Sequence, residues 1–231
     1  MIKLTSNMPK DEYTAIAYEA FDLQDDEDYS VQINDNIVLP TNWNIGLIYG
    51  ASGSGKSTLL KEKFGYTDSE FAWDNSISII STFGKIGATP KEASMALCAV
   101  GLSTIPSWIR PYSALSTGEK ARANLAISLL DFELNGNSEY LCYDEFTSTV
   151  NRQVAMSMAT SVRKYIIKHN LKVVFASCHY DIIPALKPQW VYNPQDGETL
   201  YDAESVSSYN LHYSMETSKY NDSCKSRRLE L

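Results

Sequence analysis

The sequence contains Gly50-Ala51-Ser52-Gly53-Ser54-Gly55-Lys56-Ser57, and this stretch decides the predicted fold class. It matches the pattern G-x-x-x-x-G-K-[ST]. A short apolar run, Ile45 to Tyr49, precedes it, and a helical pattern from Ser57 to Phe64 follows it and ends at Gly65. In such a loop the glycines let the backbone curl so that N–H groups point at a phosphate, and the helix N-terminus adds its dipole. Strand, loop and helix together predict a phosphate-binding site.

The loop residues have predicted roles toward a nucleotide. Lys56 is expected to reach the β- and γ-phosphates, and Ser57 to supply a hydroxyl to Mg²⁺. The other residues expected to contact the nucleotide are Gly50, Ser52, Gly53, Ser54, Gly55 and Thr58. The alternative is a glycine-rich turn without a ligand. Because a chain of this length matches the four fixed positions by chance only about 1% of the time, the nucleotide interpretation is preferred.

Composition limits the classes of function. The chain has 231 residues, 44% of them hydrophobic and 21% charged, which fits one globular domain and excludes wholesale disorder. Its formal net charge of −8 argues against binding nucleic acid or anionic lipid through bulk charge. The one basic cluster is Lys225, Arg227 and Arg228, so nucleic-acid binding stays open without support from charge.

Neither a leader nor a membrane span is expected from the sequence. No apolar segment follows the first lysines, as a secretory signal would require, and no apolar run is long enough to cross a bilayer. The four cysteines contain no CxxC pair, which argues against a zinc site of the usual spacing and against a disulfide scaffold. The sequence therefore predicts a cytoplasmic protein without membrane insertion.

Two adjacent carboxylates follow a second apolar run, Leu141-Cys142-Tyr143-Asp144-Glu145. Ligands bind at the carboxyl ends of parallel strands, so this is a favourable position for catalytic groups. Asp144 is expected to complete the Mg²⁺ shell and Glu145 to polarise a water in line with the γ-phosphate. An ordinary surface turn is the alternative, and the phosphate loop upstream makes it the weaker one.

A second anion site is predicted where Leu115-Ser116-Thr117-Gly118-Glu119 begins a long helix. A serine and a glycine at a helix N-terminus favour an anion, here through Ser116 and Gly118. One nucleotide needs only one phosphate loop, so the surplus half-site predicts two copies of the chain facing each other with ATP between them. His179, just past the last apolar strand, is expected to sense the γ-phosphate.

The periodicity predicts an α/β fold with a mainly parallel sheet and helices on both faces. Strands are expected over 13–23, 29–39, 45–49, 77–80, 140–143 and 172–178, and helices over 57–64, 118–134 and 151–169. A further helix is expected to start at Thr89 with a capping box to Glu92 and to stop near Gly101. The expected domain spans residues 1–202, with a helical part at about 85–135 and a partly ordered tail at 203–231.

The order of these motifs, Gly50–Ser57, Leu115–Glu119, Leu141–Glu145 and His179, resembles the nucleotide-binding domain of ABC-type ATPases over residues 13–200. The resemblance implies a P-loop NTPase fold with an antiparallel N-terminal β part and a shortened helical subdomain. It also implies ATP and Mg²⁺ as ligands, ATP hydrolysis, and a head-to-tail homodimer that forms on ATP binding. Two stretches, Pro106–Tyr112 and Ser177–Ile183, are most similar to soluble modules fused to a predicted acetyltransferase.

The sequence departs from the family pattern at several positions. Thr117 and Glu119 differ from the family signature LSGGQ, and Asn151 replaces an acid after the Asp-Glu pair. The family's Q-loop glutamine is missing from Ser81–Gly84. Only 60 residues separate Lys56 from Ser116, which leaves no room for the coiled coil of repair relatives. An adenine-stacking aromatic is expected upstream, with Tyr29 and Phe21 as candidates.

From this resemblance we expect a soluble ATPase that acts as a conformational switch on an unknown protein partner. Two alternatives stay open: an ATPase subunit of a membrane transporter, and a nucleotide-gated binding module with negligible turnover. The missing glutamine and the short helical part count against the transporter. A P-loop kinase is less favoured, because kinases do not need the Leu115–Glu119 element.

Overall fold

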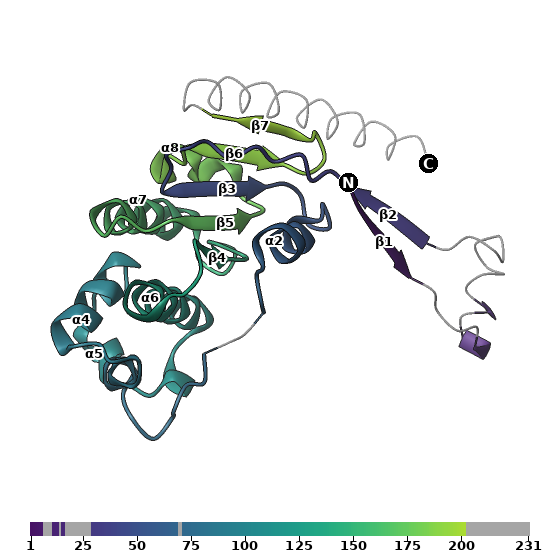
Figure 1. Cartoon of the computed structure of the whole chain (residues 1–231). Coiled ribbons are helices and arrows are strands. Elements are labelled where there is room, and N and C mark those ends of the chain that lie inside the picture. The colour runs from purple at the N-terminus through teal and green to yellow at the C-terminus, as the bar shows by residue number, and fades with distance from the viewer. Residues whose placement is uncertain (7–10, 14, 17–28, 69–70, 202–231) are drawn as a thin grey trace, which may run out of the picture.

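The computed structural model describes residues 1–6, 11–13, 15–16, 29–68 and 71–201. Its centre is a five-stranded sheet with the order β4-β5-β3-β6-β7 (Figure 1). Neighbouring strands run parallel except β6 and β7, which are antiparallel. The strands are β3 (Ile45–Tyr49), β4 (Leu141–Tyr143), β5 (Val173–Ser177), β6 (Trp190–Asn193) and β7 (Glu198–Leu200). The predicted α/β class with a mainly parallel sheet is confirmed.

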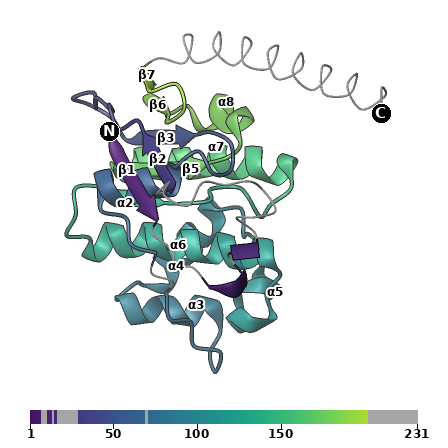
Figure 2. The ribbon, with the colours of Figure 1, turned by 90° about the vertical axis from the view of Figure 1, so that its right-hand side faces the viewer.

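Helices cover both faces of the sheet. The α-helices between residues 56 and 186 are α2 (Lys56–Phe64), α3 (Ile79–Thr82), α4 (Pro90–Ala99), α5 (Ile105–Trp108), α6 (Thr117–Asn135), α7 (Arg152–Lys168) and α8 (Ile183–Leu186). Figure 2 shows α3 to α6 gathered below the sheet. Among the described residues, no helix combines the length and apolarity that a bilayer crossing demands.

Alternate side chains of the strands belong to two separate cores. On one face Leu47 and Phe175 join the core that contains α4, α6 and α7, and on the other Ile48 and Trp190 pack against α2. Burying each of these side chains stabilises the fold by about 2 kcal/mol. A Cβ at Gly46 would lie 2.0 Å from the Trp190 ring, so only glycine lets that ring cross β3. The sheet is thereby fixed between the two helical layers.

A second, two-stranded antiparallel sheet pairs β1 (Ile2–Ser6) with β2 (Tyr29–Ile33). The predicted strand over 29–39 therefore ends earlier, at Ile33. The predicted strand over 13–23 is wrong where the structure describes it, since residues 13, 15 and 16 are helical; the rest of that range lies outside the described residues. An antiparallel N-terminal β part exists, but its partner strand is β1.

The predicted strand over 77–80 is also wrong. Ser78 caps α3 instead: its Oγ accepts a hydrogen bond from the N–H of Ser81 at 3.2 Å. Thr82 then donates from both its N–H and its Oγ1 to the Ser78 carbonyl, each at 3.1 Å. These local side-chain bonds to the backbone favour a helix start over an extended strand. Among the described residues, β4 pairs with β5 alone and forms an edge of the sheet.

The predicted helices are confirmed. Helix α4 begins with the capping box between Thr89 and Glu92, and α7 is capped by the side chain of Asn151. Helix α2 ends at Gly65, whose φ of 68° is left-handed and suits glycine. The predicted tail, residues 203–231, lies outside the described residues, as does Phe21.

Candidate nucleotide site

The loop between β3 and α2 curls through left-handed glycines. Gly53 has a φ of 80° and Gly55 a φ of 89°, conformations that side-chain-bearing residues rarely adopt. At Gly55 space is limiting as well, because a Cβ there would meet the Ile33 side chain at 2.6 Å. The second sheet therefore packs directly against this loop through Ile33, which is buried.

The N-terminus of α2 lacks a cap that the other long helices have. Side chains of Thr89, Ser116 and Asn151 cap α4, α6 and α7, whereas the N-cap residue of α2 is Gly55, which has no side chain to bond the first turn. The first N–H groups of a helix need partners from outside the helix, and a bound anion can provide them. Ser54 adds a buried hydroxyl oxygen that finds no hydrogen-bond partner in the described part of the chain. This arrangement fits a phosphate.

Lys56 lies within the loop and not in solvent. It is only 5% exposed, and its Nζ donates to the carbonyls of Gly50 at 3.0 Å and Ala51 at 2.8 Å. Two neutral carbonyls do not balance a buried ammonium charge as an anion would. The position of Lys56 thus also fits a phosphate as the additional partner.

The strand order brings three predicted elements to one edge of the sheet. Strand β5 lies between β3 and β4, and all three are parallel. The phosphate loop follows β3, His179 follows β5, and Asp144 with Glu145 follows β4, so they share the carboxyl edge. The Oδ1 of Asp144 accepts the Glu145 N–H at 2.8 Å, and the side chain of Glu145 is exposed.

The turn after β4 is tightly held. The N–H of Phe146 donates to the Ala176 carbonyl at 2.8 Å, and the Phe146 side chain is fully buried. The Oγ and N–H of Ser148 donate back to the Glu145 carbonyl at 2.8 and 3.1 Å. Glu145 and Thr147 have left-handed φ angles of 53° and 71°. The turn is fixed to β5 while Glu145 projects from it.

His179 is half-buried beside this turn. Its N–H donates to the Ser177 Oγ at 3.1 Å, and its Nδ1 lies 3.4 Å from the Thr147 Oγ1. Burial, aided by the positive charge of Arg152, lowers the pKa of His179 below its usual 6.5, while Glu145 opposes the shift. The shift favours the neutral imidazole.

Ser116 is the N-cap residue of α6, and Gly118 lies in the first turn of that helix. Ser116 forms a capping box with Glu119, whose carboxylate accepts from the Ser116 N–H at 3.0 Å and from its Oγ at 2.8 Å. These hydrogen bonds, with a third from Ser107, lower the pKa of Glu119. A Cβ at Gly118 would lie 3.2 Å from the Thr149 carbonyl. The start of α6 thus contacts the turn that follows Glu145.

The donor set at this edge suits a magnesium ion bound together with a nucleotide. Within the described ranges, no three His, Cys, Asp or Glu side chains gather closely enough to hold a metal by themselves. Mg²⁺ commonly binds through one or two protein oxygens, several waters and substrate phosphates. Ser57, in the first turn of α2, and Asp144, directly after β4, both carry side-chain oxygens of the kind that Mg²⁺ prefers.

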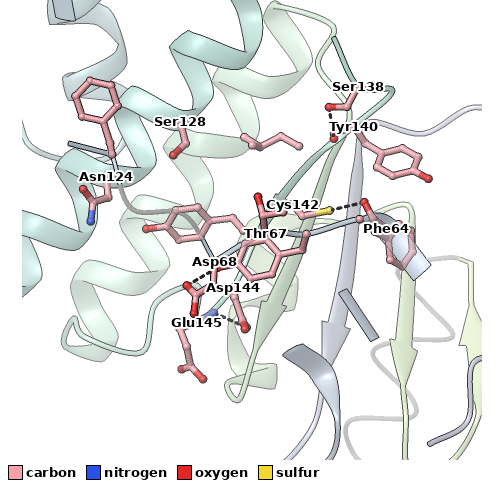
Figure 3. A pocket seen from close by; sticks show the side chains of 15 residues that line it. Phe64, Thr67, Asp68, Asn124, Ser128, Ser138, Tyr140, Cys142, Asp144 and Glu145 are labelled. Carbon is pink, nitrogen blue, oxygen red and sulfur yellow. Dashed lines mark hydrogen bonds between the residues drawn. The ribbon is translucent and has the colours of Figure 1, made fainter. Parts of the chain in front are cut away.

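A cavity of about 490 Å³ lies along the free edge of β4, next to Asp144 and Glu145 (Figure 3). Tyr66 and Asp68 line it, and the Tyr66 hydroxyl donates to the Asp68 Oδ1 at 3.4 Å. Burial together with Asp68 and Asp144 raises the pKa of Tyr66 to about 12. Neither residue was predicted as part of the site, because residues 66–68 belong to no motif.

Comparison with solved structures identifies the fold. A bacterial Atm1-family ABC exporter with ATP bound superposes with a TM-score of 0.57 at 15% identity, covering 81% of this chain and 42% of the exporter chain. The dimeric ATP-binding cassette MJ0796, bound to ADP and Pi, gives 0.52 at 15% identity over 76% of this chain and 89% of that one. CbiO1 from Clostridium perfringens gives 0.53 at 17% identity, covering 79% and 83%.

The chain has the fold of an ABC-type ATPase domain. No protein-family model matches the sequence, and a search of curated proteins gives no match either. At identities of 15–17% the likeness establishes the fold, and the roles of individual residues depend on the geometry described above.

Proposed function

We propose that this protein binds ATP with Mg²⁺ and hydrolyses it at a head-to-tail interface between two copies of the chain. The observation that carries the proposal is the uncapped start of α2, with Lys56 inside the loop, at the sheet edge that also presents Asp144 and Glu145. Three groups with complementary chemistry toward a triphosphate converge on that edge.

Each group has a distinct role in this proposal. The N–H groups of Gly53, Gly55 and the first turn of α2, with the side chains of Ser52, Ser54 and Thr58, bind the phosphates, and Lys56 neutralises their charge. Ser57 and Asp144 would hold Mg²⁺, which when bound offsets the negative charge of the phosphates. Glu145 orients and polarises the attacking water, and His179 contacts the γ-phosphate.

The second half-site belongs to the partner subunit. Ser116 and Gly118 would contact the γ-phosphate bound by the other copy, and MJ0796, which has this fold, was solved as a dimer. Closure on ATP and reopening on hydrolysis would drive a change in an unknown protein partner. In this proposal residues 1–202 form the ATPase domain, with 85–135 as its helical subdomain, in the cytoplasm. The likeness to acetyltransferase-fused modules stays a prediction.

The test is nucleotide binding and turnover in Lys56→Ala, with Lys61→Ala as the matched control. Lys61 lies in the same helix but is exposed, so its loss removes an equal charge without touching the loop. Loss of the charge-assisted phosphate contact is expected to cost about 2–3 kcal/mol, or roughly a hundredfold in ATP affinity or turnover. Calorimetry measures the ATP affinity, and phosphate release measures the turnover. Equal affinity and turnover in the two variants would exclude the nucleotide site.

A further inference from the structure

Thr147 combines features that are unusual for a threonine. It is 4% exposed, and its φ of 71° is left-handed. For a β-branched residue such a conformation is a genuine outlier, since the branched side chain crowds the backbone. Strained residues of this kind persist only where their surroundings hold them, and they cluster at functional sites.

The surroundings of Thr147 are held on both sides. Its neighbour Phe146 donates from its N–H to the Ala176 carbonyl at 2.8 Å and accepts from the Ser177 Oγ at 2.8 Å. The same Ser177 Oγ accepts the N–H of His179 at 3.1 Å. Ser177 therefore fixes the backbone of the turn and the backbone of His179 relative to each other.

Between these two fixed backbones, the side chains meet. The Thr147 Oγ1 lies 3.4 Å from the Nδ1 of His179. The other ring nitrogen, Nε2, makes no hydrogen bond to the described part of the chain, so it is the nitrogen left for a ligand. Phosphate oxygens accept hydrogen bonds, and a neutral imidazole can donate to them only from the nitrogen that carries its single proton.

We propose that Thr147 is a positioning residue that donates from Oγ1 to Nδ1 and thereby keeps the proton of His179 on Nε2, facing the γ-phosphate. The inference rests on the proposed contact between His179 and the nucleotide. Thr147 itself touches neither phosphate nor metal in this account; it acts through the imidazole. Its strained backbone conformation is then a consequence of directing the hydroxyl at His179.

The experiment compares full-length wild type, Thr147→Val and Thr147→Ser. Valine keeps the shape and the β-branch but removes the hydroxyl, whereas serine keeps the hydroxyl and relieves crowding. The chain has only three histidines, so ¹⁵N signals of labelled histidine can be resolved and assigned with His179→Gln. Spectra without nucleotide report the tautomer and the Nδ1 hydrogen bond. ATP turnover and ATP affinity are measured on the same samples, and melting temperatures verify folding.

In the valine variant, the Nδ1 signal of His179 should shift as its hydrogen bond is lost. Turnover should fall about tenfold with ATP affinity unchanged, as for other outer-shell partners, and serine should restore both signal and rate. In the His179→Gln background, Thr147→Val should have no further effect on turnover. Unchanged His179 signals in Thr147→Val would overturn the proposal. A shifted signal with normal turnover in His179→Gln would support the contact and refute instead the proposed role of His179.

Discussion

Glu145 is held in a left-handed conformation, with a φ of 53°, that few side chains adopt. For an L-residue other than glycine, asparagine or aspartate this conformation costs about 1–2 kcal/mol. The Ser148 and Phe146 hydrogen bonds around it supply the compensation. A strained residue at the carboxyl edge of the sheet is consistent with selection for the position of its carboxylate over stability.

This strain predicts a stability difference between two inactive variants. Glu145→Asn and Glu145→Gln both remove the charge, but asparagine tolerates a left-handed backbone. The asparagine variant should therefore be more stable than the glutamine variant by roughly 0.5–1 kcal/mol. Urea unfolding of the two proteins measures the difference. Equal midpoints, or a more stable glutamine variant, would mean that the turn holds Glu145 without strain.

At the level of single residues, the sequence identifies the groups with evident chemistry and misses those that position them. Lys56 and Asp144 follow from motifs, and the structure places both at the expected sheet edge. Thr147 and Tyr66 do not follow from the sequence. Thr147 stands out by its backbone angle, and Tyr66 by lining the cavity beside β4, and neither feature leaves a signal in the pattern of residue types.

At the level of elements, the start of α6 combines a helix cap with the proposed second half-site. The carboxylate of Glu119 accepts hydrogen bonds from the N–H and Oγ of Ser116, and a third from Ser107 lowers its pKa further. A group with a lowered folded pKa contributes stability above its unfolded pKa, near 4.5, and this contribution is lost as pH falls through the folded value.

Glu119→Gln should accordingly destabilise the protein at pH 7 by about 0.3–1 kcal/mol, because glutamine keeps an acceptor oxygen but loses the negative charge at the helix N-terminus. The difference should shrink as pH falls below 4.5 and vanish once Glu119 is protonated in the folded wild type. Ser107→Ala removes one of the two side-chain donors to the Glu119 carboxylate and should give a smaller effect of the same sign. Denaturant unfolding from pH 3 to pH 7 tests this. A difference that is constant across that range would exclude an ionised cap.

Elements with local signals could be predicted, and elements that depend on distant contacts could not. The capping box of Thr89 and Glu92 predicts the start of α4 from the sequence, and the structure confirms it. The apolar residues near Ile79 suggest a strand, but the hydrogen bonds of Ser78 and Thr82 make a helix. Strand β1 has little pattern of its own and exists through its pairing with β2.

At the level of the whole molecule, the order of the strands brings the site together. Placing β5 between β3 and β4 brings His179 between the phosphate loop and the two carboxylates. The alternation of strands and helices predicts a parallel sheet but not this order, because strand order depends on which apolar faces pack together in three dimensions. The same order leaves β4 as an edge strand beside the cavity in Figure 3.

The central claim is that two chains close on ATP and that hydrolysis reopens them. Glu145→Gln tests it most directly, because glutamine keeps the size and hydrogen bonding of the side chain but removes the charge that polarises water. Nucleotide and Mg²⁺ should still bind through Lys56, Ser57 and Asp144. The barrier of the chemical step should rise by a few kcal/mol, which slows hydrolysis about a hundredfold or more. Asp144→Asn is the matched comparison, since it weakens the metal site that closure requires.

The measurement is the mass in solution by light scattering, with and without Mg-ATP, for wild type, Glu145→Gln and Asp144→Asn. The account predicts that Glu145→Gln with Mg-ATP reaches twice the chain mass of 25.9 kDa, while Asp144→Asn stays at the single-chain mass. Wild type should return to the single-chain mass as its ATP is consumed. A Glu145→Gln protein that has bound ATP and still scatters as a single chain would contradict the ATP-closed dimer.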